Sequence, residues 1–199
     1  MILRKISFLL LPTVLTVIFF SCDNGKKVSD GSGGADSLLI KYNALIDSVD
    51  VNWAVMIADD DDKLVLMKRL LLEVSYTNNY DKAKYQELKE MVDQLKAMRY
   101  DQTTMINSSL IDAYDSATFA ISDQIIEFAR NHPRFDDIPL MEELIDDING
   151  KNSYVLMHRI HYDNWVKELN SFKKNNLDKL LATDPVLETE SMPLFELPS

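Results

Sequence analysis

Cysteine is almost absent from this chain of 199 residues, in which Cys22 is the only one. A single cysteine excludes an intrachain disulfide, so no disulfide framework can hold the fold together. Glycine and proline are also scarce, since only Gly150, Pro133 and Pro139 occur between residues 37 and 179. Because little in this stretch breaks a helix and its apolar residues recur at spacings of three and four, the sequence predicts an all-α domain.

Basic residues are outnumbered: 21 Lys and Arg face 32 Asp and Glu, which gives a net charge of −11. Such a surface repels nucleic acid and anionic lipid headgroups, so we expect no nucleic-acid partner. Catalytic motifs are lacking too, because the sequence has no Gly-x-Ser-x-Gly, no phosphate-binding glycine loop and no Glu-x-x-His. We therefore expect neither an enzyme nor a bound cofactor.

Residues 1–21 have the pattern of a lipoprotein signal peptide. Arg4 and Lys5 precede an apolar run that is shorter than the about 20 residues of a transmembrane helix. Ser21 is the small residue expected before a lipidated cysteine, and lipid on Cys22 would give the lone thiol a use. The alternative is an ordinary signal peptide with an incidental cysteine. We predict a lipid-anchored protein of the cell envelope, at the outer membrane or periplasmic face rather than the inner membrane.

The mature chain divides into three parts. Residues 22–36 comprise the lipidated cysteine and a glycine-rich tether, and residues 37–182 form the helical domain. An acidic, proline-containing tail follows over residues 183–199, and we expect its apolar residues Leu194, Phe195 and Leu197 to pin it to the domain.

Four long helices are expected in the domain. The first starts at Asp36 or Ser37 and ends before Asp59, and the others span about 62–96, 101–130 and 139–172. A polar bend interrupts the second at residues 77–81. Helices of this length predict an elongated antiparallel four-helix-type bundle.

Two polar clusters are candidate functional sites. Four consecutive acids, Asp59–Asp62, are interpreted as a solvated turn between the first two helices, with a weak divalent-cation site as the alternative. His158 and His161 lie three residues apart on one helix face. Zinc usually needs at least three protein ligands, so we expect no metal site and regard the pair as half-exposed surface.

Arg159 is placed unusually, together with Asn152, on the apolar seam of the last helix. A buried guanidinium needs a carboxylate or carbonyl partner, and Asp47 and Asp50 are the expected candidates. The alternative is that Arg159 lies at the edge of the seam and extends outward into solvent.

These positions carry a family resemblance. Matching motifs lie on the first helix, on the last helix and at the link His132-Pro133-Arg134-Phe135 between the third and fourth. Through these motifs the chain resembles the LemA family of long-helix bacterial envelope proteins over about residues 38–175. Asp163, Leu169 and the acidic run depart from the family pattern. The resemblance implies an antiparallel four-helix bundle and transfers no activity. The matching residues are Tyr42, Asn43, Val49, Trp53, Arg159, Tyr162, Val166 and Asn170.

The sequence thus favours a non-enzymatic, lipid-anchored helical bundle that acts as a structural or interaction module with an envelope protein partner. The alternative is a periplasmic or surface binding module for a small ligand or a divalent cation, using the histidine pair or the acidic run.

Overall fold

A computed structural model describes residues 33–195. Its elements are helices α1 (Gly33–Ser75), α2 (Lys82–Met98), α3 (Ser108–Arg130) and α4 (Pro139–Thr183), with short 3-10 turns η1 (Thr104–Ile106) and η2 (Phe135–Asp137). No strand occurs among these residues, so the all-α bundle is confirmed. The signal peptide, Cys22, most of the tether and Leu197 lie outside the described residues.

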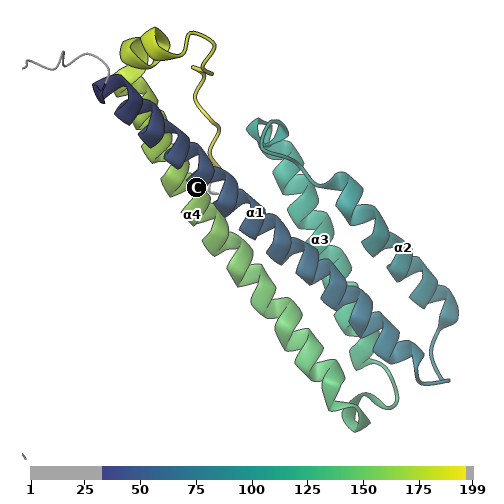
Figure 1. The fold of residues 1–199 in the computed structure, drawn as a ribbon. Helices are drawn as coiled ribbons and strands as arrows, with labels where there is room; N and C mark the ends of the chain where they lie inside the picture. The colour runs from purple at the N-terminus through teal and green to yellow at the C-terminus, as the bar shows by residue number, and fades with distance from the viewer. Residues whose placement is uncertain (1–32, 196–199) are drawn as a thin grey trace, which may run out of the picture.

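Helices α1 and α4 form a long antiparallel pair, and the shorter α2–α3 hairpin covers one side of it (Figure 1). The long pair extends beyond the hairpin at the end where α1 begins and α4 ends, and there the chain after α4 folds back (Figure 1). No helix in residues 33–195 combines the length and apolarity that a membrane span requires. The core runs the length of the bundle, and its largest fully buried side chains include Tyr162, Met56, Met67, Leu70, Leu71, Leu88, Leu95, Met105, Ile125, Met141, Leu144 and Ile145.

Local signals fixed three of the helix boundaries. The expected bend at residues 77–81 is a true helix break, after which Asp81 caps α2 by accepting hydrogen bonds from the backbone amides of Ala83 and Lys84. Helix α3 ends at Arg130 before His132-Pro133, and Pro139 occupies the first turn of α4, as the sequence predicted.

His132 joins the two breaks at this end of the bundle. Its Nδ1 accepts a hydrogen bond from the amide of Arg134, so Nε2 carries the proton and donates to Thr77 Oγ1 at 2.5 Å. Thr77 in turn donates to the carbonyl of Val74, the last core residue of α1. The buried chain of bonds fixes the α1–α2 loop against the α3–α4 turn.

Three boundary predictions were wrong. Helix α1 begins at Gly33 and continues through Asp59–Asp62 to Ser75, so no turn divides it. Helix α3 starts at Ser108 rather than near residue 101. The side chain of Asp101 accepts hydrogen bonds from the backbone amides of Thr103 and Thr104, and these bonds stabilise a turn before the helix. Helix α4 continues past Phe172 to Thr183, where Leu180 is still buried.

Candidate functional site

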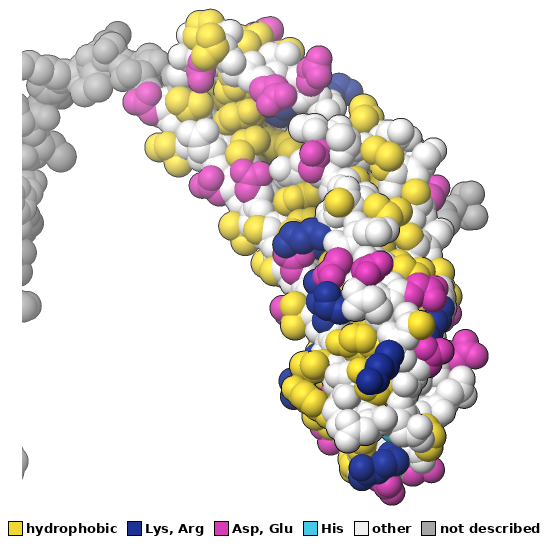
Figure 2. All heavy atoms as spheres, turned by 90° about the vertical axis from the view of Figure 1, so that its right-hand side faces the viewer, with side chains coloured by type: hydrophobic (Ala, Val, Ile, Leu, Met, Phe, Trp, Pro, Cys, Tyr) yellow, Lys and Arg dark blue, Asp and Glu magenta, His cyan; other side chains and the backbone are white. Residues whose placement is uncertain are grey.

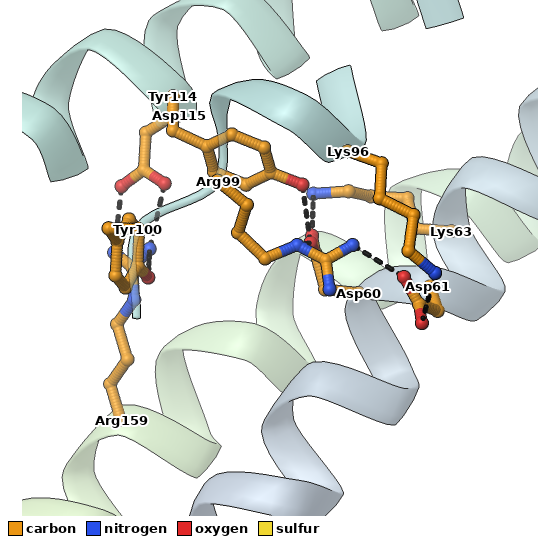
Figure 3. A network of polar contacts seen from close by, with 9 residues as sticks. All are labelled: Asp60, Asp61, Lys63, Lys96, Arg99, Tyr100, Tyr114, Asp115 and Arg159. Carbon is orange, nitrogen blue, oxygen red and sulfur yellow. Dashed lines mark hydrogen bonds and ion pairs between the residues drawn. The ribbon is translucent and has the colours of Figure 1, made fainter. Parts of the chain in front are cut away.

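The four consecutive acids Asp59–Asp62 of α1 point in different directions, and each lies beside at least one cation of the bundle. Asp60 points inward and is 5% exposed. Its carboxylate accepts a hydrogen bond from the Tyr114 hydroxyl of α3, lies 2.9 Å from Arg99 Nε after α2, and lies 3.4 Å from Lys63 Nζ (Figure 3). Lys63 is itself 6% exposed. Asp60 is therefore a buried anion beside two cations, Lys63 and Arg99, of which Arg99 is shared with Asp61.

The remaining acids lie nearer to solvent and are also paired. Asp61 accepts from Arg99 Nη2 at 2.5 Å and from Lys96 Nζ at 3.2 Å. The hydrogen bond from Arg99 outweighs burial and lowers the pKa of the Asp61 carboxyl below its ordinary value. Asp62 is the exposed member, 3.2 Å from Lys151 Nζ.

Asp59 joins α1 to α4. Its carboxylate accepts from Lys151 Nζ at 2.5 Å and from His158 Nε2 at 2.7 Å. The bond from Lys151, with a smaller effect of His158, lowers the pKa of Asp59 despite its partial burial. The interpretation of the run as a solvated turn is wrong, because cations on other parts of the bundle meet these carboxylates inside a continuous helix.

Arg159 is 14% exposed in its side chain and makes a two-pronged ion pair with Asp115 of α3, both distances being 2.7 Å. It also donates to the Tyr100 hydroxyl at 2.8 Å (Figure 3). Burial raises the pKa of Tyr100 to about 12, although the guanidinium acts in the opposite direction. Asp47 and Asp50 are exposed and do not pair with Arg159, so that prediction was wrong. The inward face of α1, defined by Leu45 and Val49, leaves both acids outside it.

Most of the predicted motif residues are structural. Trp53 and Tyr162 pack in an edge-to-face arrangement at 5.4 Å between ring centroids, and Val166 is fully buried beneath them. Tyr42 is buried closer to the start of α1, and Asn43 is exposed. Asn152 is exposed too, so its predicted place on the apolar seam of the last helix was wrong.

Phe195 of the tail completes this aromatic cluster. Its ring stacks on Trp53, with 6.2 Å between centroids and 13° between planes, and meets Tyr162 and Tyr100 edge-on. The Arg159 guanidinium lies 5.0 Å from the ring centroid, within cation–π range. Phe195 is 5% exposed, which confirms that it pins the tail, and Leu194 is half-buried.

The histidine pair does not form a joint site. His158 is partly buried against Asp59, while His161 is exposed and its ring centroid lies 6.5 Å from that of His158. Within residues 33–195, no three His, Cys, Asp or Glu side chains come together in a way that could hold a metal ion.

The polar centre has no room for an organic ligand. The cavity among Asp60, Arg99, Tyr100, Tyr114 and Arg159 measures about 10 Å³, which corresponds to one water molecule at most. The wider hollow between α1 and α4, beside Val65, Gly150 and Tyr154, is an open surface groove. Neither resembles the concave, mostly enclosed pocket that binds small molecules.

The outer face of α4 has an unusual polarity that sequence reasoning missed. Between Lys151 and Lys167 the only Asp, Glu, Lys or Arg side chains are Arg159 and Asp163, and both turn into the bundle. Large apolar side chains face solvent instead, namely Tyr154, Leu156, Met157, Ile160 and Trp165. We call this set the α4 apolar face.

The α2 and α3 side of the bundle has the ordinary pattern. Figure 2 looks onto that side and shows Lys, Arg, Asp and Glu side chains scattered among the hydrophobic ones. A surface helix normally turns its charges to water and its apolar stripe to the core. Helix α4 keeps its apolar stripe in the core but, between Lys151 and Lys167, exposes large apolar side chains where charged ones are usual.

Comparison of the chain with protein-family models, with curated proteins and with solved structures gave no match in any of the three.

Proposed function

We propose that this protein is a non-enzymatic helical module of the bacterial cell envelope, held to a membrane by lipid on Cys22, and that it binds a protein partner through α4. The observation that carries the proposal is the α4 apolar face. Large apolar side chains gathered on one exposed helix face are typical of an interaction site. The partly buried α1–α4 ion pairs at Asp59 hold the helix that presents it.

The matches to LemA motifs support a place in that family, which implies an antiparallel helical bundle and transfers no activity. Three of the motif residues, Trp53, Tyr162 and Arg159, lie together around Phe195.

Position-specific crosslinking in cells tests the partner surface. We expect a photo-crosslinking amino acid at Leu156, which is 50% exposed on α4, to capture a discrete protein. The same probe at Glu90, an exposed position on α2, is the matched control and should capture none. Adding Ile160→Asp should abolish the Leu156 crosslink, because a carboxylate in a docked apolar face loses its hydration. Equal labelling from Leu156 and Glu90 would refute the assignment.

Cys22→Ala tests the anchor. We expect the variant to lose incorporation of a fatty-acid analogue completely, because no other cysteine can accept the lipid. The thermal unfolding of its helical domain should not change, since within residues 33–195 the buried core residues lie at Tyr42 and beyond. Undiminished label on the variant would contradict the proposed anchor.

A further inference from the structure

The chain after α4 lies along the bundle as an extended strap, defined here as residues 184–195. It has no regular helix or strand, and it returns beside α4 toward the middle of the molecule (Figure 1). Leu187 and Phe195 are buried, while the residues between them are exposed or half-buried. The strap therefore reaches the core at Leu187 and Phe195 and lies along a surface groove between them.

Side chains of α4 hold the strap mainly through its backbone. The Asn170 amide donates to the Met192 carbonyl at 2.9 Å and accepts from the Met192 amide at 2.9 Å, which imitates the pairing of a neighbouring β-strand. Asp163 accepts from the Phe195 amide at 2.9 Å, and Lys173 Nζ donates to the Glu190 carbonyl. These bonds require an extended backbone and no particular side chain.

The groove is built for a polar backbone as well as for an apolar ring. With the strap in place Asp163 is 5% exposed and Lys173 is 4% exposed, and the strap backbone supplies a hydrogen-bond partner to each of these two buried groups. Burial raises the pKa of Asp163 and lowers the pKa of Lys173, which are the directions expected for charges that water hardly reaches. Specificity comes from the Phe195 ring, which fills the aromatic cluster.

We infer that this groove is a binding site for an extended peptide of a partner protein, with an aliphatic–proline–aliphatic–aromatic sequence like Met192-Pro193-Leu194-Phe195, and that the strap is its exchangeable resident. Main-chain bonds supply affinity and one aromatic pocket supplies selectivity, as in other extended-peptide sites. The inference rests on the proposed interaction role and names the partner's chemistry. A tethered strap has a high effective concentration, so a free peptide enters only when the strap is weakened.

Peptide binding to the purified full chain tests the inference. The probe is a fluorescent peptide of residues 188–195, followed by anisotropy. We expect Phe195→Ala, which weakens the strap, to bind the probe at least about tenfold more tightly than the wild type, because the probe supplies the ring that the strap lacks. A probe with Ala in place of its Phe should not bind. Adding Asn170→Ala to Phe195→Ala should weaken probe binding by about tenfold.

Absence of binding to a Phe195→Ala chain with native helix content would overturn the inference and make the strap a fixed structural part. If that variant does not fold, hydrogen exchange of the wild type decides. The amides of Met192 and Phe195 should exchange by local opening, and exchange only with global unfolding would overturn the inference.

Sedimentation of the wild type should show monomers. A dimer would mean that the groove is occupied by the strap of a second copy, which would overturn the inference. Because binding is measured with purified components, its failure is separable from failure of the crosslinking at Leu156.

Discussion

Replacing Asp60 by Asn should cost about 3–5 kcal/mol of unfolding free energy, the usual loss when one partner of a buried ion pair is removed. Asn is nearly the same size and can still accept from Tyr114, so the loss reflects charge rather than volume. The variant affects Lys63 most, because among residues 33–195 Asp60 is the only acid within ion-pair distance of its buried ammonium. Urea unfolding followed by circular dichroism measures the change.

The acidic run supplies its own control. Asp62 lies two residues away in the same helix, and its side chain is 66% exposed, so Asp62→Asn should cost less than about 1 kcal/mol. Combining Asp60→Asn with Lys63→Met should recover a large part of the loss, because the double variant no longer buries an unpaired ammonium. Equal losses for the two single Asn variants would show that Asp60 is no more dependent on burial than Asp62.

Local chemistry explains why the fold class and most helix breaks were predictable. Pro139 fixes the start of α4, His132-Pro133 prevents α3 from continuing, and the polar segment at 77–81 offers side-chain hydrogen bonds that compete with a helix. Each of these signals depends on neighbours within a few residues. They can be read without knowing the tertiary structure.

The acidic run was misread because its partners are distant in sequence. Lys63 meets Asp60 from within the same helix, but Lys151 and Arg99 reach Asp59 and Asp61 from positions 92 and 38 residues away, and the sequence near the run does not indicate these distant partners. One local signal was available. The apolar stripe of α1 continues from Val49 and Met56 through the position of Asp60 to Met67, which favours a single helix.

The partner of Arg159 was missed for a related reason. Asp115 lies on the same stripe of α3 as Ile111 and Thr118, both of which are buried, so its placement beside an apolar seam was visible in the sequence. Choosing it over Asp47 or Asp50 required knowing which helix faces α4 at that level. The backbone clamps of Asn170 and Asp163 left no sequence signal, since an extended peptide offers the same groups at every residue.

Replacing Arg159 by Met should cost about 2–3 kcal/mol, less than the loss at Asp60, because its partner is more accessible to water. The Asp115 side chain is 42% exposed and regains hydration when the guanidinium is removed. The Tyr100 hydroxyl is buried and loses the bond that Arg159 donates. Phe195 loses a cation held 5.0 Å from its ring, while Met preserves most of the packing volume. Denaturant unfolding gives the difference.

Removing the other member of the ion pair, Asp115, tests whether the more buried partner determines the loss of stability. Asp115→Ala should cost as much as Arg159→Met or more, because it leaves the less exposed member of the pair, the guanidinium, without a carboxylate. Tyr100→Phe removes only the hydroxyl and should cost about 1 kcal/mol. Losses below about 1 kcal/mol for both Arg159→Met and Asp115→Ala would class the contact with ordinary surface pairs. Arg159 would then have no structural reason to lie on the seam of α4, and its side chain would be free to contact the peptide that we place beside Phe195.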